Sequence, residues 1–335
     1  MTLDLADVLA ARRVIAGRAD ATPLVPSPYL SARAGREVLL KLELAQATGA
    51  FKLRGALNAV SGLAAGVPGV TCCSTGNHGR AVAYAARKRG LRAIVCMSRL
   101  VPANKVEAIR ALGAEVRIVG ASQDDAAAES RRLAAEEGLA EIPPFDHPAV
   151  IAGQGTIGLE LLEARPDLAA ILVPLSGGGL AAGVALAAKA IKPSIRVIGV
   201  TMDRGAAMHD SIRSGRPVEV REVESLADSL GGGIGLDNRL SFALCRDLLD
   251  DTVLVGEDAI YRALQAHVFE DRLICEGAAA VGAAVLMDGL VDLPDGPVAT
   301  ILTGRNVDMA VLSDIAAGRD VVLGDTFVKG RAHAA

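Results

Sequence analysis

One lysine stands where its amine could carry out chemistry. Lys52 lies in the stretch 48–55, between an apolar run that predicts a strand (38–43) and a helical pattern over 57–63. Phe51 precedes it, and glycines stand on both sides. A lysine amine that is taken out of water loses its charge and becomes a nucleophile able to form a Schiff base. The stretch therefore offers a candidate Schiff-base lysine, with an ordinary first-turn lysine beside a core phenylalanine as the alternative.

A glycine loop offers a site for a phosphate. Ser176, Gly177, Gly178, Gly179 and Leu180 follow an apolar strand and open an apolar helix. Successive glycines let backbone N–H groups converge, and the helix N-terminus adds partial positive charge. The loop is a candidate phosphate cradle, and a tight strand–helix turn is the plain alternative.

The same glycines allow a rival interpretation, a nicotinamide-dependent dehydrogenase. Gly177 and Gly179 with Gly183 form a loosened dinucleotide fingerprint, and Asp203 lies near the end of the next predicted strand. The spacing departs from the fingerprint, and a lone glycine pattern is weak.

A second polar loop follows another apolar strand. Ser74, Thr75, Asn77 and His78 surround Gly76 at a predicted helix start. Hydroxyls, an amide and backbone N–H groups at such a place suit a carboxylate or a polar ring substituent. In the alternative, Ser74 or Thr75 only caps the helix, and His78 is structural.

A third polar loop comes late in the chain. Thr303, Gly304, Arg305 and Asn306 follow the apolar strand predicted at 297–302. Loops at the carboxyl ends of parallel strands are where open α/β sheets place ligands.

Composition limits the classes of protein. The chain has 335 residues with a net charge of −4 and no basic stripe, which disfavours nucleic acid and acidic membranes as partners. Its five cysteines form neither a disulfide framework nor a zinc motif. The uncharged run 168–188 is long enough to span a bilayer, but Pro174 and three glycines interrupt it, so we expect a strand, a turn and a helix. No signal peptide is recognisable, so we expect a cytoplasmic protein.

Strand and helix patterns alternate along the chain, which predicts parallel sheets flanked by helices. The predicted strands are 38–43, 70–73, 93–97, 115–119, 171–175, 196–200, 252–255 and 297–302. The predicted helices, besides the one after Lys52, are 3–17, one ending at Arg89, 103–112, 124–137, 150–164, 180–190, 257–270 and 277–288.

The order of these motifs resembles the fold-type-II pyridoxal-phosphate (PLP) enzymes, which include threonine and serine dehydratases and serine racemase. The resemblance runs from about 22 to 306 and implies a two-domain α/β fold like that of tryptophan synthase β, with the active site in the interdomain cleft. It implies a large cofactor-binding domain of 1–67 plus 151–325, a small domain of 68–150, and a homodimer. At closer range the chain is similar to the hydroxyectoine utilisation dehydratase family in the stretches 74–80, 96–102, 143–148, 228–237 and 304–308.

The resemblance also implies roles for the cofactor residues. Lys52 matches the lysine that binds PLP covalently, Phe51 packs against the ring, and Asn77 contacts the ring hydroxyl. The segment 176–180 matches the phosphate loop, and Thr303 matches the hydroxyl residue that faces the pyridine nitrogen. Lys52 would also act as the general base that removes the α-proton of the substrate.

Substrate contacts are implied for Ser74, Thr75, Asn77, His78 and Arg305. Thr75 matches the racemase hydroxyl on the opposite face of the cofactor, so it is a second candidate catalytic residue. An arginine offers a planar fork to a carboxylate or carbonyl, and Arg305 stands where the group usually has glycine. We expect it to help select a substrate larger or more polar than threonine, with a surface arginine as the alternative.

Other departures from the group concern Arg80 and the metal site of serine racemase. Arg80 stands where glutamine is common. The two metal-ligand positions of the racemase match Thr201 and Ala207, which are poor ligands, so no divalent metal is expected there.

The leading function is therefore that of a PLP-dependent carbon–oxygen lyase. It would remove water and ammonia by β-elimination from a β-hydroxy amino acid, by resemblance a hydroxyectoine-derived one. A threonine/serine or 3-hydroxyaspartate dehydratase and a serine racemase-like enzyme are alternatives in the same class. The dehydrogenase is the alternative from another class, and a non-catalytic binding protein is disfavoured because Lys52 and its partners are all present.

Overall fold

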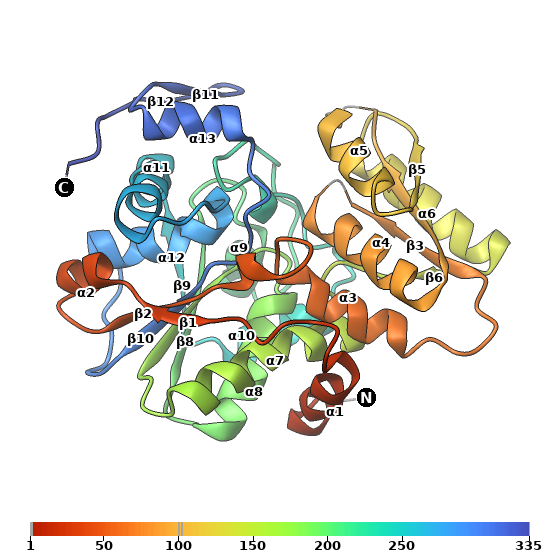
Figure 1. The fold of residues 1–335 in the computed structure, drawn as a ribbon, viewed down its shortest axis with the longest axis horizontal. Helices are drawn as coiled ribbons and strands as arrows, with labels where there is room; N and C mark the ends of the chain where they lie inside the picture. Colours follow the sequence, from red (N-terminus) through yellow and green to blue (C-terminus); the bar gives the residue numbers. More distant parts are fainter. Residues whose placement is uncertain (1–2, 75, 100, 102, 335) are drawn as a thin grey trace.

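The computed structural model describes residues 3–74, 76–99, 101 and 103–334. Its chain forms two halves, each built on its own sheet, with the small-sheet half on the right in Figure 1. The larger sheet has the strand order β1-β2-β10-β7-β8-β9, in which β1 is antiparallel to β2 and all other neighbours are parallel. Its strands are β1 (Leu24–Pro26), β2 (Val38–Lys41), β7 (Ala170–Pro174), β8 (Arg196–Met202), β9 (Asp251–Val255) and β10 (Val298–Ile301).

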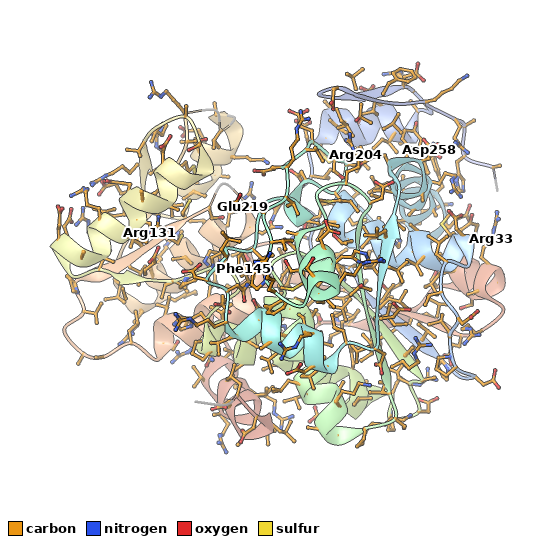
Figure 2. All side chains as sticks on the ribbon, turned by 180° about the vertical axis from the view of Figure 1, so that it is seen from behind. Arg33, Arg131, Phe145, Arg204, Glu219 and Asp258 are labelled. Carbon is orange, nitrogen blue, oxygen red and sulfur yellow. The ribbon has the colours of Figure 1, made fainter. Side chains whose placement is uncertain are left out.

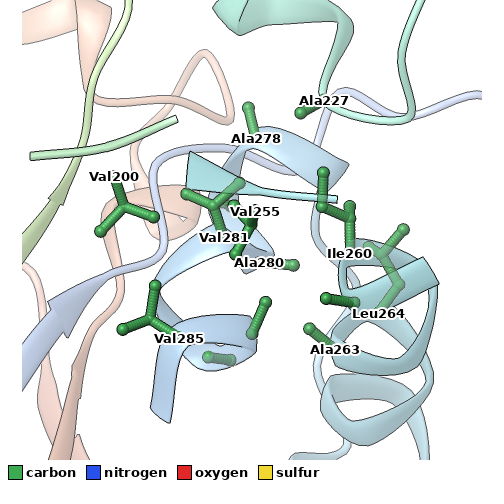
Figure 3. Packing of buried hydrophobic residues seen from close by; sticks show 14 of the residues in the cluster. Val200, Ala227, Val255, Ile260, Ala263, Leu264, Ala278, Ala280, Val281 and Val285 are labelled. Carbon is green, nitrogen blue, oxygen red and sulfur yellow. The ribbon is translucent and has the colours of Figure 1, made fainter. Parts of the chain in front are cut away.

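The central strands of this sheet are buried on both faces, which is why they are continuous apolar runs in the sequence. Successive side chains point to opposite faces. Leu40 and Leu172 belong to a core cluster that includes residues of α11 (Glu257–Ala266) and α12 (Gly277–Asp288). Figure 3 shows small and branched side chains of α12, such as Ala280 and Val281, next to Ile260 and Leu264 of α11. Leu39 and Ile171 belong to a second cluster, with residues of α7 (Pro148–Ala164) and α8 (Gly179–Ile191).

The smaller sheet is all parallel, in the order β5-β4-β3-β6. Its strands are β3 (Gly69–Cys73), β4 (Arg92–Met97), β5 (Glu115–Ile118) and β6 (Ala140–Glu141), and its helices are α4 (Asn77–Arg89), α5 (Ala103–Arg110) and α6 (Gln123–Glu137). The sheet and its helices fall within the predicted small domain, although the domain boundaries themselves remain a prediction. Figure 1 shows these elements grouped apart from the larger sheet.

The helix that begins at Lys52 lies where the halves meet. α3 (Lys52–Ser61) packs against α4 of the smaller half and against α7 (Pro148–Ala164) of the larger half. Gly55 and Gly153 allow the approach of α3 to α7, because a Cβ at Gly153 would lie 2.7 Å from the α-carbon of Gly55. Lys52 is thus held at the start of a helix that touches both halves.

The remaining elements complete the larger half. The helices are α1 (Leu5–Ile15), α2 (Pro28–Ala34), α8 (Gly179–Ile191), α9 (Ala207–Ser214), α10 (Leu240–Leu248) and α13 (Met309–Ala316), with short turns η1 (Glu43–Ala45), η2 (Asp228–Leu230) and η3 (His267–Asp271). The strands β11 (Val321–Leu323) and β12 (Thr326–Val328) form a separate hairpin near the C-terminus. No helix in the described part of the chain has the length and apolar composition needed to span a bilayer.

The predicted α/β fold with parallel-rich sheets is confirmed, and all eight predicted strands are present within a few residues of their expected bounds. The run 168–188 is a strand, a glycine turn and a helix, as expected. Several short elements were not predicted: β1, β6, α2, α9, α10, α13 and the β11–β12 hairpin. The helix predicted over 257–270 ends as an α-helix at Ala266 and continues as a single wide turn.

Candidate active site

Lys52 is positioned by a pairing between two distant segments of the chain. Ala50 and Gly304 form an isolated antiparallel bridge, in which the N–H of Phe51 donates to the carbonyl of Thr303 at 2.9 Å. Gly49, at φ 75°, makes the turn into this pairing. The pairing lies at the carboxyl ends of the adjacent parallel strands β2 and β10, so Lys52 and the late loop at 303–306 meet at one edge of the sheet.

A buried ionic network anchors the first turn of α3. The Arg54 guanidinium is 1% exposed and donates to the carboxylates of Glu43 (2.8 Å from both Nε and Nη2) and Glu160. Lys41, also buried, pairs with Glu160 and donates to the carbonyl of Thr22. The network thus contains two cations and two carboxylates, whose charges balance. Its arginine stands two residues beyond Lys52.

The Lys52 side chain is half-buried in the site, and its amine is poised to lose its proton. Its Nζ donates to the carbonyl oxygen of Pro144 at 2.8 Å. Burial lowers the pKa of Lys52 to about 8, and the negative charge of Glu276 offsets part of that effect. Near neutral pH a useful fraction of the amine is therefore uncharged and nucleophilic.

The glycine loop forms a close turn between β7 and α8. Gly178, at φ 85°, takes a left-handed conformation that favours glycine, and α8 begins at Gly179. A Cβ at Gly177 would overlap the ring of Phe145. The hydroxyl of Ser241 donates to the carbonyl of Gly177 at 2.8 Å, and this hydrogen bond holds the loop in place. The first N–H groups of an α-helix have no partner within the helix, so those of α8 are suited to bind an anion.

Asn77 begins α4 and is held by two partners. Its Nδ2 lies 3.0 Å from each carboxylate oxygen of Glu276, and its Oδ1 accepts from Nδ2 of Asn306 at 2.6 Å. Glu276 also accepts from the hydroxyl of Ser229 at 3.2 Å. Burial raises the pKa of Glu276 to about 6, and the hydrogen bonds from Asn77 and Ser229 act in the opposite direction.

His78 is buried and lies next to Asn77 on α4. Its Nε2 lies 2.7 Å from the carbonyl oxygen of Ile142, so Nε2 carries the proton of the neutral ring. Burial and the nearby charge of Lys52 lower the pKa of His78 to about 3, which keeps the ring neutral. Ser74 is also buried, and its hydroxyl accepts from the N–H of Gly76 at 3.3 Å. Thr75, the second candidate catalytic residue, lies outside the described residues.

Thr303 follows β10 and is 2% exposed. Its Oγ1 has no hydrogen-bond partner among the described residues. A buried hydroxyl without a partner costs free energy, so its presence here indicates a ligand that completes the bond.

A cavity of about 720 Å³ joins these residues. Its lining includes most of the residues predicted from the sequence, namely Phe51, Lys52, Ser74, Asn77, His78, Ser176, Gly177, Gly178, Gly179, Leu180 and Thr303. It also includes Arg80, Phe145, Glu219, Glu276 and Asn306, of which Phe145 and Glu219 are labelled in Figure 2.

Arg305 is the exception, and the structure corrects its expected place at the substrate. Its side chain is exposed and is not part of the cavity lining. The N–H of Arg305 donates to the carbonyl of Gly49 at 2.9 Å, and a Cβ at Gly49 would lie 3.3 Å from Cγ of Arg305. The backbone pairing therefore lays the side chain over Gly49, outside the cavity.

Glu276, Arg80 and Asn306 are among the polar residues of the cavity that were missed as site residues. Glu276 had a readable signal, because it is the only charged residue in the run 273–287. Arg80 and Asn306 stood inside motifs already noted, but nothing local shows that the two side chains meet across the cavity, where Nη1 of Arg80 donates to Oδ1 of Asn306 at 3.0 Å.

The described residues contain no group of three or more His, Cys, Asp or Glu side chains that could hold a metal ion. Thr201 is buried in β8 and Ala207 begins α9. The expected absence of a divalent metal at these two positions stays a prediction.

The residues present fit PLP, which carries an aldehyde, a phosphate, a ring hydroxyl and a ring nitrogen. An amine with a lowered pKa, a glycine turn at a helix N-terminus, a side-chain amide and an orphaned buried hydroxyl match these four groups in turn. All four line one cavity.

Comparisons with known proteins agree with this fit. A curated protein of Sinorhizobium fredii, provisionally named a threonine dehydratase, is 56% identical over 94% of this chain and 96% of its own length. The catabolic L-threonine dehydratase of Escherichia coli K12 is 39% identical over 92% of this chain and 94% of its own length. Among solved structures, maize serine racemase has a TM-score of 0.89 at 34% identity, covering 94% of this chain and 97% of its own. Threonine deaminase isoform 2 of Solanum lycopersicum has a TM-score of 0.85 at 36% identity, covering 93% and 91%.

The family model described as "Pyridoxal-phosphate dependent enzyme" matches residues 15–304, a range that runs from the end of α1 to the loop after β10 and includes Lys52, the glycine loop and Thr303. The chain belongs to this family and is a PLP-dependent enzyme.

Proposed function

We propose that the protein is a PLP-dependent dehydratase that removes water and ammonia from a β-hydroxy α-amino acid. The observation that carries the proposal is the Lys52 amine, with a pKa of about 8, in one cavity with the glycine loop and Thr303. The relatives named for threonine dehydratase and threonine deaminase activity support the same reaction class. The family match favours this class over the nicotinamide-dependent alternative.

Four groups of the chain would hold the cofactor. Lys52 would bind it covalently, the turn at 176–180 would hold its phosphate, Asn77 would contact its ring hydroxyl, and Thr303 would face its ring nitrogen. Bound there, PLP supplies an electron sink for the charge that develops when the α-proton leaves. A neutral hydroxyl at position 303 has no charge with which to hold a proton on the ring nitrogen, which favours prompt loss of the β-hydroxyl.

Lys52 is the proposed general base. An amine with a pKa of about 8 can both accept and return a proton near neutral pH. His78 is a poor candidate for this role, because its pKa is lowered to about 3 and its Nε2 is bound to the carbonyl of Ile142. The N-terminus of α4 beside Ser74 would hold the α-carboxylate of the substrate through backbone N–H groups.

The substrate expected from the sequence is a hydroxyectoine-derived β-hydroxy amino acid. The relatives named above concern threonine and serine instead, so L-threonine and L-serine are the second candidates. The racemase relative favours a further candidate activity, interconversion of serine enantiomers, in which Thr75 would act on the opposite face of the cofactor.

Ammonia and 2-oxo acid release from a small substrate panel tests the proposal. The panel holds L-threonine, L-serine, threo-3-hydroxyaspartate and the ring-opened products of hydroxyectoine. We expect turnover of at least one of them, and loss of both turnover and the visible absorption of lysine-bound cofactor in Lys52→Ala. The exposed Lys329→Ala variant is the control for loss of a lysine as such. No release of ammonia from any member of the panel, or turnover retained in Lys52→Ala, would overturn the proposal.

A further inference from the structure

Arg80 brings a positive charge into the cavity and makes no ion pair with any residue that the structure describes. It lies on α4, one turn beyond Asn77, is half-buried and lines the cavity. Among the residues that the structure describes, no carboxylate oxygen lies within 4.0 Å of its guanidinium. Burial lowers the pKa of Arg80, and the charge of Glu276 offsets this only in part. A partly buried cation without an ion-pair partner costs free energy, and a bound oxygen ligand would offset that cost.

The guanidinium is held from one side only. Its Nη1 donates to Oδ1 of Asn306 at 3.0 Å, and Nδ2 of Asn306 is in turn fixed by the carbonyl of Thr48 (3.0 Å) and by Oδ1 of Asn77 (2.6 Å). This is the single side-chain hydrogen bond that Arg80 makes to the described residues. A guanidinium carries five N–H donors in a planar fork. Most of them are therefore left for a ligand in the cavity.

The position of Arg80 differs from that of the groups that would hold an α-carboxylate. Those groups are the N–H donors at the start of α4 and the loop at Ser74, whereas Arg80 lies three residues along the helix, about 4.5 Å further along its axis. Residues three apart lie on the same helix face, so Asn77 and Arg80 address one side of the cavity. A cavity of about 720 Å³ is large enough for a cofactor together with a side chain longer than that of threonine.

We propose that Arg80, oriented by Asn306, binds an oxygen-acceptor group that the substrate carries beyond its β-carbon, a carboxylate or an acyl carbonyl. The inference rests on the proposed dehydratase function and names its substrate class: β-hydroxy α-amino acids with a second polar group. Arg80 takes the role that the sequence suggested for Arg305, since Arg80 lines the cavity and Arg305 does not.

The test compares substrates that differ in one group. L-Threonine and threo-3-hydroxyaspartate share the β-hydroxyl and differ in a methyl against a carboxylate, and the ring-opened Nγ-acetylated product of hydroxyectoine supplies an acyl carbonyl. In the wild type and in Arg80→Gln, kcat/KM is measured for all three. For each acceptor-bearing substrate, kcat/KM is divided by the value for threonine. We expect this ratio to fall about 10- to 100-fold in Arg80→Gln, because the variant loses hydrogen bonds made by a charged group. A fall confined to hydroxyaspartate identifies the carboxylate, and one confined to the acetylated compound identifies the carbonyl.

Binding without turnover gives an independent readout. L-Aspartate and L-2-aminobutyrate lack the β-hydroxyl, so their Kd values can be measured from changes in cofactor absorption without elimination. If the acceptor group is a carboxylate, we expect Arg80→Gln to weaken the binding of L-aspartate about tenfold or more relative to the binding of L-2-aminobutyrate. Retention of the lysine-bound cofactor spectrum in Arg80→Gln shows that the site is still assembled.

Arg305→Gln is the matched control, because it removes a guanidinium that is exposed and lies outside the cavity lining. We expect its substrate ratios to stay within about threefold of wild type. Unchanged kcat/KM ratios in Arg80→Gln, or a larger fall of these ratios in Arg305→Gln, would overturn the inference. The proposed function would stand in that case as long as the wild type releases ammonia. A wild type inactive on all three substrates would instead count against the proposed function itself.

Discussion

The amide nitrogen of Asn77 lies 3.0 Å from both carboxylate oxygens of Glu276. Asn77 begins α4 of the smaller half, and Glu276 precedes α12 of the larger half, so this contact connects the two halves across the cavity. Asn306 holds the other end of the same amide at 2.6 Å. The orientation of the Asn77 amide in the cavity is therefore set by Asn306 and by a carboxylate that is itself buried.

The Glu276 carboxylate should make stability depend on pH. Its folded-state pKa is raised from 4.5 to about 6, so the ionised group destabilises the fold above about pH 6, and the penalty diminishes as pH falls toward 4.5. We expect Glu276→Gln to raise the free energy of unfolding by up to about 2 kcal/mol at about pH 8 and by less than half of that at about pH 5. Urea unfolding at the two pH values measures the difference.

The exposed Glu107 offers a control for this experiment, because Glu107→Gln changes only a surface ion pair with Arg110. We expect its effect to stay within about 0.5 kcal/mol at both pH values. A destabilised Glu276→Gln at high pH would show that the carboxylate contributes more through its hydrogen bonds than its burial costs.

Covalent capture of PLP should speed up as pH rises. The neutral amine of Lys52 is the reactive form, and its lowered pKa places the midpoint near about pH 8. Stopped-flow absorption after mixing PLP with cofactor-free enzyme, over about pH 6.5 to 9.5, gives the rate. The midpoint should move to lower pH in Glu276→Gln, because the Glu276 charge raises the pKa of Lys52. A capture rate that does not vary with pH would contradict the assignment of Lys52 as the titrating nucleophile.

The turn at Gly177 should tolerate no side chain. A Cβ there would overlap the Phe145 ring, so Gly177→Ala must displace either the loop or the ring. We expect a loss of about 1–3 kcal/mol in stability and weaker binding of PLP, measured by unfolding and by cofactor titration. Gly62→Ala is the matched control, since the nearest atom to its Cβ lies at an ordinary 3.5 Å. Equal effects of the two substitutions would show that Phe145 moves aside without cost.

The buried network behind Lys52 should be costly to break. Arg54→Leu would leave Glu43, which is 0% exposed, without its main cationic partner. Loss of one partner of a buried pair typically costs about 3–5 kcal/mol. Arg12→Leu breaks an exposed pair with Glu163, and we expect less than about 1 kcal/mol there. Thermal unfolding compares the two variants, and equal effects of Arg54→Leu and Arg12→Leu would contradict the prediction.

The parts of the site that were predictable from the sequence are those with a local signal. Lys52, Asn77 and the turn at 176–180 each stand where an apolar strand pattern gives way to a helical one, and the structure brings all of them to one cavity. Glu276, Arg80 and Asn306 act through contacts between segments far apart in the chain, which no local pattern encodes. The expectation for Arg305 failed for a related reason. The side of the Ala50–Gly304 bridge on which the Arg305 side chain lies is set by the backbone pairing of Arg305 with Gly49. It is not set by the residues next to Arg305 in the sequence.

In the fold, too, the elements with a local sequence signal were predictable and those that depend on long-range contacts were not. Long apolar strands buried on both faces were predictable, whereas the two-residue strand β6 and the three-residue strand β1 depend on the edges that neighbouring strands offer them. The order of the strands in the larger sheet was not predicted at all, because it depends on long-range pairing.

That strand order has a consequence for how the protein is made. β10, which comes late in the chain, lies between β2 and β7, and it carries Thr303 and Asn306 to the lysine just beyond β2. During synthesis Lys52 leaves the ribosome long before the strand that must separate β2 from β7, and domains generally fold as units as they emerge. The larger sheet can close only when residues 298–306 have been translated. A chain that stops short of β10 therefore keeps its reactive lysine but has no pocket around it.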